Sequence, residues 1–264
     1  MLDLMTPTEA IGRAQAELTA LPACIARSAV SAETYGLPLG KFSDVDVFCF
    51  TPEALMVGAQ RLIHAGFTLD DRHERVYYRW LKYGMSSWHT NSLKFHDDDQ
   101  LEVNLIFKSV NRNPLTSLSQ VLESFDFGLL GTGYELESGQ RLDLRGYLFP
   151  GMDPDGPLPL MPQRREAWRG GFISQYQGLR ELGRYAKYCR RGYDLSLVKD
   201  DLIEGYMNAG LYFSTRTEPD KQLLSRIYYA CADKIVVGDL DDIEQASKEI
   251  LTLDSLDSIM EALE

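Results

Sequence analysis

The clearest pattern of polar and apolar residues lies at residues 44–50, where Asp-Val-Asp-Val-Phe-Cys-Phe alternates and then becomes fully apolar. This pattern predicts a β-strand that is buried along most of its length. Thr51 and Pro52 follow at once, and they suit the N-cap and the first turn of a helix. We expect that helix to run to about Ala65, because Gly66 then provides a stop.

The rest of the N-terminal half combines helical composition with runs of aromatic and β-branched residues. The start signal Pro7-Thr8-Glu9 opens a segment of helical composition, which predicts a helix over residues 8–26. Turn-forming residues separate the aromatic and β-branched runs, and this spacing predicts strands. The expected strands cover residues 74–83, 91–96, 101–108, 125–130 and 142–149, with a short helix near 117–123.

Residues 150–162 hold five prolines and two glycines, which predicts a linker or a long wrapping loop. The segments beyond it have helical patterns, at residues 164–191, 196–209, 219–237, 240–251 and 255–263. We therefore expect an α/β (α+β) domain over residues 1–149, followed by an all-helical C-terminal domain over residues 163–264.

The composition narrows the class of protein. Of the 264 residues, 44% are hydrophobic and 25% charged, as in ordinary globular proteins. No run approaches the roughly 20 apolar residues needed to cross a bilayer, and the N-terminal Met-Leu-Asp-Leu has no signal-peptide pattern. The four cysteines are scattered, and neither they nor the four histidines show the spacing of zinc ligands. We expect a cytoplasmic protein with reduced cysteines, without zinc and without a membrane partner.

The net charge of −12 is unevenly distributed. Residues 1–163 hold 13 basic and 21 acidic side chains, residues 164–199 hold 9 and 3, and residues 200–264 hold 5 and 15. A positive segment therefore lies between two acidic ones. The overall balance argues against non-specific DNA binding and favours a small anionic ligand or one specific RNA.

Asp44 and Asp46 are the strongest candidates for chemistry. Residues two apart on a strand point to the same face, with Cα atoms roughly 6–7 Å apart. Two such carboxylates can share a divalent ion, and Mg²⁺ takes oxygen ligands at about 2.1 Å while it retains sites for phosphates. Two like charges beside an apolar strand are costly unless a cation or donors satisfy them. The alternative is that Asp44 caps a turn and Asp46 sits on an exposed strand face.

The stretch Leu39–Phe48 (LGKFSDVDVF) resembles the DNA polymerase β-like nucleotidyltransferase superfamily, whose members carry a Gly-Ser or Gly-Gly turn and a helix, then Asp-x-Asp at the start of a strand. The segments TNSLKF, LEVNLI and VLESFDF look like a run in viral and phage nucleotidyltransferase-like proteins, at residues 90–95, 101–106 and 121–127. The resemblance covers about residues 28–149, and RYAKYCRRG at residues 184–192 extends it. It implies a nucleotidyltransferase-type mixed sheet with flanking helices.

The resemblance also implies a third carboxylate on a later, neighbouring strand, and Glu102 is our candidate. On its expected strand, Glu102, Asn104 and Ile106 share one face. The alternative is a solvated edge residue that continues the acidic turn at residues 97–99. Asp126 lies between two phenylalanines, so we expect it to be a buried acceptor that needs partners.

The sequence departs from the family at the glycine doublet, where we can place only Ser31-Ala32. Glycine lets the backbone approach a triphosphate and donate amide hydrogen bonds, whereas alanine crowds the phosphates. The hydroxyl of Ser31 is a substitute donor. The departure leaves open an impaired enzyme or a binding protein with a vestigial site.

Further candidates for contacting a nucleotide come from loops, strands and one helix. Lys41, Ser43, Asn91 and Ser92 are loop and strand candidates, although Asn91 and Ser92 could instead hydrogen-bond a turn. Arg180, Arg184 and Lys187 stand at i, i+4 and i+7, so they share one stripe of an expected helix and could hold a triphosphate or an RNA end. The alternative for this stripe is a solvated face paired with the acidic C-terminal helices.

The resemblance implies a Mg²⁺- or Mn²⁺-dependent nucleotidyltransferase that moves a nucleoside monophosphate from an NTP such as ATP to an RNA end, a protein or another hydroxyl acceptor. Asp44, Asp46 and Glu102 would be the catalytic metal ligands, and Glu102 would help to lower the pKa of the attacking hydroxyl. The second hypothesis is a catalytically inactive protein of the same fold that binds or inhibits a host or partner macromolecule. A nucleotide-binding antitoxin or regulator is a third.

Overall fold

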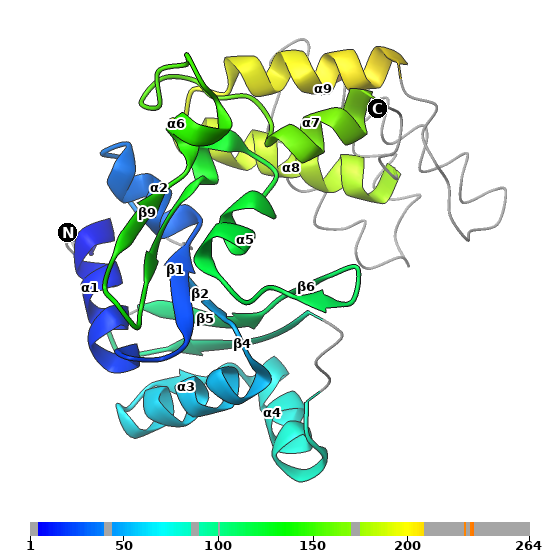
Figure 1. Cartoon of the computed structure of the whole chain (residues 1–264). Coiled ribbons are helices and arrows are strands. Elements are labelled where there is room, and N and C mark those ends of the chain that lie inside the picture. The colour runs from blue at the N-terminus through cyan, green and yellow to red at the C-terminus, as the bar shows by residue number, and fades with distance from the viewer. Residues whose placement is uncertain are drawn as a thin grey trace, which may run out of the picture. The chain divides into compact units, whose positions relative to one another are not determined.

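The computed structural model describes residues 5–39, 44–85, 90–99, 101–169, 175–208, 230 and 233–234 (Figure 1). The chain divides into two compact units, and we describe each by itself. The first unit contains residues 1–125 and 129–150, and the second contains residues 126–128 and 151–264. The expected helices at 240–251 and 255–263, and most of the one at 219–237, lie outside the described residues.

The first unit alternates helices and strands. Its helices are α1 (Pro7–Leu18), α2 (Ser28–Thr34), α3 (Pro52–His64), α4 (Asp71–Tyr83), α5 (Leu118–Glu123) and α6 (Arg145–Leu148). Its strands are β1 (Ala23–Ala26), β2 (Val45–Cys49), β3 (Thr68–Leu69), β4 (Asn91–His96), β5 (Glu102–Phe107), β6 (Ser109–Val110), β7 (Asn113–Pro114), β8 (Thr132–Glu135) and β9 (Arg141–Asp143). A short 3₁₀ helix covers Gly128–Leu130.

Seven strands form one sheet in the order β3-β4-β5-β2-β1-β8-β9. Strands β2 and β5 run parallel, and every other pair in this sheet is antiparallel. The expected mixed sheet with flanking helices is therefore confirmed. The parallel pair needs a long crossover, which α3, β3, α4 and β4 provide.

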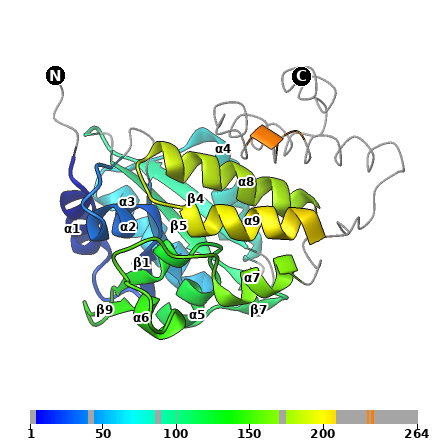
Figure 2. The same ribbon diagram turned by 90° about the horizontal axis from the view of Figure 1, so that it is seen from above.

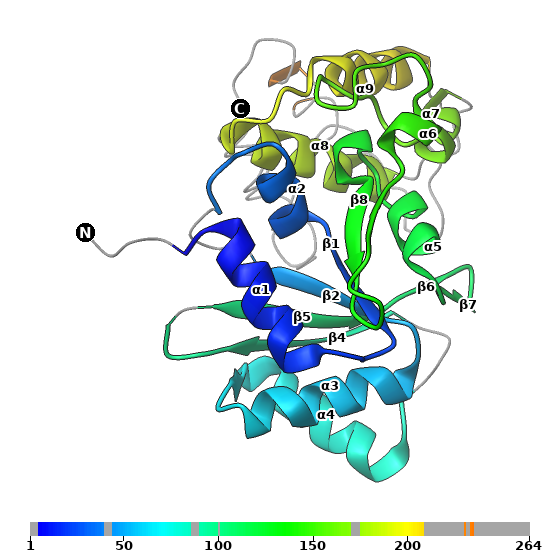
Figure 3. The ribbon, with the colours of Figure 1, turned by 60° about the vertical axis from the view of Figure 1, so that its left-hand side comes forward.

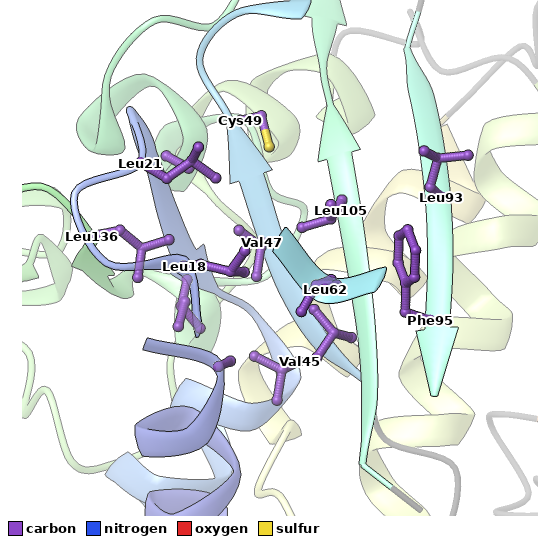
Figure 4. Packing of buried hydrophobic residues seen from close by; sticks show 14 of the residues in the cluster. Leu18, Leu21, Val45, Val47, Cys49, Leu62, Leu93, Phe95, Leu105 and Leu136 are labelled. Carbon is purple, nitrogen blue, oxygen red and sulfur yellow. The ribbon is translucent and has the colours of Figure 1, made fainter. Parts of the chain in front are cut away.

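One face of the sheet packs into a continuous apolar core with α1 and α3 (Figure 4). Alternate strand residues such as Val47 and Leu105 point into this core, where they meet Leu18 from α1 and Leu62 from α3. All four side chains are fully buried. Burying a side chain of this size stabilises the fold by about 1.5–3 kcal/mol, so this core determines which strand face points inward.

The helix starts follow the local sequence. Thr6 and Glu9 form a capping box at the start of α1. Thr51 caps α3 by accepting a hydrogen bond from the backbone amide of Ala54, and Pro52 occupies the first turn, as predicted. Helix α1 lies against both α2 and α3 (Figure 2).

The opposite face of the sheet carries α5 at the side of β1 and β8 (Figure 3). Gly133 on β8 allows this approach, because a Cβ there would lie 2.7 Å from Leu118 Cδ1 on α5. It would also lie 2.9 Å from the carbonyl oxygen of Ile25 on β1. The glycine is therefore required by a close contact between helix and sheet.

Several expected elements are wrong in type or extent. The helix predicted over residues 8–26 ends at Leu18, and Ala23–Ala26 is strand β1. The run at 74–83 is part of helix α4, because His73, Tyr77 and Trp80 form one helical face and Asp70 caps the start. The strand expected at 125–130 is replaced by a turn and the 3₁₀ helix, and the one at 142–149 by the end of β9 and by α6.

In the second unit, the regular secondary structure of the described residues is helical, apart from one isolated bridge. Its helices are α7 (Pro162–Arg169), α8 (Gln175–Arg190) and α9 (Ser196–Asn208). Residues 158–161 (Leu-Pro-Leu-Met), near the end of the expected linker, are buried, and Leu160 forms a β-bridge with Phe127. No helix in the described ranges is both long and apolar enough to traverse a bilayer.

Candidate functional site

A row of aligned residues crosses the sheet on the face opposite to the α1 and α3 core. Ala26 on β1 pairs with Asp46 on β2, which in turn pairs with Asn104 on β5. Asn104 then pairs with Lys94 on β4. Paired residues on neighbouring strands point to the same face. Residues two positions away on one strand share that face as well, and this places Glu102 beside the row.

The carboxylate of Asp46 is buried and has two partners on this face. The side-chain amide of Asn104 donates a hydrogen bond to Asp46 Oδ1 at 3.0 Å. The guanidinium of Arg27 pairs with Asp46 Oδ2 at 3.4 Å. The side chain of Asp46 is only 7% exposed, so a positive partner and a donor offset most of its desolvation cost.

Lys94 forms ion pairs with the other two predicted carboxylates, those of Glu102 and Asp44. Its amine lies 2.7 Å from Glu102 Oε2 and 3.3 Å from Asp44 Oδ2. The two carboxylate oxygens therefore lie no farther apart than these two distances together, about 6.0 Å. Burial alone would lower the pKa of Lys94, but its hydrogen bonds and charge interactions with Glu102 and Asp44 outweigh that effect and raise it. Lys94 is thus a firmly charged counter-ion.

Arg27 is the one residue between β1 and α2, and it forms the turn that joins them. Arg27 has φ 70° and ψ −137°, a backbone conformation that glycine adopts easily and that strains other residues. Ser31 and Ala32, where the resemblance led us to place the glycine doublet, both lie inside α2 and not in this turn. Arginine stands where the fold demands a glycine-like conformation, and its side chain reaches Asp46.

An aromatic pair lies beside the ion pair of Arg27 and Asp46. Phe125 packs on Phe48 with 5.4 Å between ring centroids. Arg27 lies over the same ring at 5.8 Å from its centroid, and Lys108 at 5.2 Å. The amine of Lys108 also donates hydrogen bonds to the carbonyl and hydroxyl oxygens of Ser124. Arg27 therefore contacts both Asp46 and the Phe125 ring, whereas Lys108 contacts that ring and Ser124.

Carboxylates are ligands of the type that a divalent ion takes, although cationic side chains of the protein neutralise them in this structure. Opposite ligands of Mg²⁺ lie about 4.2 Å apart, so the carboxylates of Asp44 and Glu102 need only a modest rotation, with Lys94 displaced, to share one. Among the described residues, no group of three or more His, Cys, Asp or Glu is already arranged to hold a metal ion. The cost of two like charges, which suggested a metal, is offset here by Lys94, Arg27 and Asn104.

The other candidates in the first unit are dispersed. Ser31 is fully buried, and its hydroxyl donates to the carbonyl of Leu129. Ser92 shares a face with Lys94, whereas Asn91 points to the opposite face of β4. Lys41 and Ser43 lie outside the described residues.

Helix α8 of the second unit carries the predicted basic stripe. Arg180 is exposed, Lys187 is half-buried, and Arg184 forms an ion pair with Asp126. Asp126 is buried and also pairs with Arg164 at 3.2 Å, so the expectation that it needs partners is confirmed. Arg184 therefore has a structural partner within its own unit.

Two members of the site were not predicted from the sequence, Arg27 and Lys94. Strand alternation could have found Lys94, because the turn at residues 97–99 joins β4 and β5 as a hairpin and brings Lys94 opposite Asn104. Arg27 gave no signal, since arginine is not a residue that marks a glycine-type turn.

Comparisons of the chain with protein-family models, with curated proteins and with solved structures gave no match.

Proposed function

We propose that this protein is a metal-dependent nucleotidyltransferase that moves a nucleoside monophosphate from an NTP to a hydroxyl acceptor. The observation that carries the proposal is the convergence of Asp44, Asp46 and Glu102 on one face of the parallel strands β2 and β5. A strand, a glycine-type turn and a helix precede the Asp-x-Asp pair. This order of elements supports the resemblance to nucleotidyltransferases noted in the sequence.

The mixture of charges suits a ligand that carries both signs. A nucleoside triphosphate with a divalent ion offers a cation to the carboxylates and phosphate oxygens to Lys94 and Arg27. Binding would exchange internal ion pairs for pairs with the ligand, so neither group of side chains loses a counter-charge. Either half of the ligand alone would leave one group unsatisfied, which is costly for partly buried charges.

Each side chain then has a defined role. Asp44, Asp46 and Glu102 would hold the divalent ion, which as a Lewis acid lowers the pKa of the attacking hydroxyl and offsets phosphate charge. Asn104 keeps the carboxylate of Asp46 oriented by its hydrogen bond. Arg27 and Lys94, once released, would bind the triphosphate, and their charges would stabilise the departing pyrophosphate.

Transfer is tested with NTPs labelled at the α-phosphate, Mg²⁺ or Mn²⁺, and total RNA or lysate as acceptor. We expect label to appear on an acceptor, and Asp46→Asn to reduce the transfer to background. The matched control is Asp98→Asn, which removes the same charge from an exposed position in the β4–β5 turn. Equal loss in both variants would contradict a specific role for Asp46.

Ligand exchange is tested by calorimetric titration with Mn²⁺ alone, a non-hydrolysable NTP alone, and each in the presence of the other. We expect either ligand to raise the affinity for the other by about 5- to 150-fold. Lys94→Gln should raise the affinity for Mn²⁺ alone and lower that for the nucleotide. Independent binding of the two ligands would contradict the exchange.

A catalytically inactive binding protein is the second candidate, and Arg27 favours it. An arginine in a glycine-type turn that pairs with Asp46 could keep the metal site closed permanently. In that case the wild type shows no transfer and no coupled binding of Mn²⁺ and nucleotide. Coupled binding that appears only in Arg27→Gly would identify a vestigial site.

A further inference from the structure

Helix α4 carries a stripe of positive charge on its outer surface. Arg72, Arg75, Arg79 and Lys82 are all exposed and stand at i, i+3, i+7 and i+10. This spacing aligns them along about 15 Å of one helix face. The acidic residues of the helix, Asp71 and Glu74, lie in its first turn, where they interact favourably with the helix dipole.

The stripe is not needed to attach α4 to the rest of the unit. The helix docks through its other face, with Tyr77 buried and Trp80 packed against the core. Its N-terminus is capped by Asp70, whose carboxylate accepts a hydrogen bond from the backbone amide of Arg72. Folding therefore leaves the four cationic side chains available.

Among the residues that the structure describes, carboxylates satisfy other arginines of this unit, but not those of α4. Arg13 pairs with Asp97 and Asp99, and Arg145 pairs with Asp143. Within the described ranges, no carboxylate lies at ion-pair distance from the guanidinium of Arg72, Arg75 or Arg79. In a chain with a net charge of −12, a stripe that no carboxylate of the described residues neutralises points to an anionic ligand from outside.

Exposed aromatic rings lie on both sides of the stripe. Tyr78 is 60% exposed and Tyr83 is 72% exposed, values that are unusual for side chains of this size. The amine of Lys82 lies 5.1 Å from the centroid of the Tyr83 ring, and Tyr78 packs against buried Tyr77 at 5.7 Å between centroids. The rings are thus held in place beside the cations.

We propose that the outer face of α4 binds single-stranded nucleic acid. The cationic stripe pairs with successive phosphates, and Tyr78 and Tyr83 stack on unpaired bases. In a duplex the faces of the bases are buried by stacking, so a duplex would contact the cations but would not stack on the tyrosines. The acids on the same helix and the single exposed leucine, Leu81, make the face a poor anchor for a lipid surface. This inference does not depend on the transferase site, because binding needs neither NTP nor metal.

The test is fluorescence anisotropy of labelled oligouridylate and oligothymidylate with the full chain, in the presence of EDTA. We expect saturable binding at low salt, with a slope of log affinity against log salt of about −3 for four phosphate contacts. The double variant Arg75→Gln/Arg79→Gln should bind at least about tenfold more weakly and reduce the magnitude of the slope by about 1.4. Tyr78→Ala should weaken binding by about 5- to 100-fold and leave the slope unchanged.

The matched control is Arg112→Gln, which removes an exposed arginine from the β6–β7 turn. It should bind like the wild type, and circular dichroism should show that all variants remain folded. The proposal is overturned if the wild type does not bind, if the control loses as much affinity as the α4 variants, or if duplex DNA or anionic vesicles bind in preference to the single strands. The two oligonucleotides separate RNA from DNA as the natural source.

Discussion

Arg27, in the turn after β1, forms an ion pair with Asp46 on the neighbouring strand β2, with the guanidinium 3.4 Å from the carboxylate, while the Arg27 backbone adopts a conformation suited to glycine. The pair offsets the buried charge of Asp46 at the expense of backbone strain. A strained residue of this kind costs about 1–3 kcal/mol and persists only where its surroundings hold it. The electrostatic gain of the side chain and the strain of the backbone are therefore combined in one residue.

Replacing Arg27 separates these two effects. Arg27→Ala removes the counter-charge and keeps the strain, whereas Arg27→Gly removes both. We expect the glycine variant to be more stable than the alanine variant by about 1 kcal/mol or more, the reverse of the usual order of these residues. Chemical denaturation measures the difference, and an alanine variant as stable as the glycine variant would show that the turn is not strained.

Asn104 is the neutral neighbour of Asp46 in the row of aligned residues that crosses the sheet. Asn104→Asp places a carboxylate directly beside that of Asp46, so we expect a loss of about 1–3 kcal/mol in the free energy of unfolding without divalent ions. Mn²⁺ should recover most of this loss, because a cation can then satisfy both carboxylates. Thermal melts with and without Mn²⁺ measure the effect.

The control for this substitution is Ser92→Asp. Ser92 shares the site face of β4 but pairs with Ile106, away from the carboxylates. This variant adds the same negative charge without placing it beside Asp46, so Mn²⁺ should stabilise the variant no more than it stabilises the wild type. A similar Mn²⁺ response in both variants would indicate a general charge effect.

Glu181 makes the stability of the second unit depend on pH. Burial raises its pKa to about 7, although the charge of Arg164 and the hydrogen bond from the indole of Trp168 act to lower it. The unfolded chain releases this proton near about pH 4.3. The folded state therefore holds the extra proton between these values, so the free energy of unfolding should fall as pH rises from about 4.5 to 7.

Glu181→Gln tests this assignment. Glutamine keeps the size of the side chain and an acceptor for the Trp168 indole, but it does not titrate. We expect the variant to lose less stability than the wild type over that pH range, measured by denaturant titration at several pH values. Parallel pH profiles of the two proteins would exclude Glu181 as the titrating group.

Two glycines should respond in opposite ways to alanine. Gly133→Ala places a Cβ 2.7 Å from Leu118 Cδ1 and 2.9 Å from a backbone oxygen, so we expect a loss of about 1–3 kcal/mol. Gly12 lies within α1 with nothing inside 4 Å of the added Cβ. Gly12→Ala should therefore stabilise the protein by about 0.5–1 kcal/mol. Equilibrium unfolding of both variants measures the contrast.

The sequence predicted those parts of the fold in which pattern and local chemistry agree. Strand β2 and helix α3 were predicted nearly to their bounds, since an apolar run is followed directly by Thr51 and Pro52. Helix α4 was mistaken for a strand because its aromatic residues favour strands, although the helical spacing of Tyr77 and Trp80 was already present. Strand β1, four residues long, was lost inside a longer segment of helical composition.

The same contrast applies to the candidate site. The shared face of Glu102 and Asn104 follows from strand alternation and is confirmed. Their proximity to Asp46 depends on β5 lying parallel to β2, which no local pattern specifies. Arg27 could not be predicted for a different reason, because its positive φ is imposed by the connection between β1 and α2.

Residues 126–128 interleave the two units along the chain. They belong to the second unit, where Asp126 meets Arg164 and Arg184, yet residues of the first unit flank them on both sides along the chain. A chain truncated after Pro150 would keep every strand of the large sheet, but the buried carboxylate of Asp126 would lose its partners Arg164 and Arg184. A single cut in the chain therefore cannot separate the two units completely.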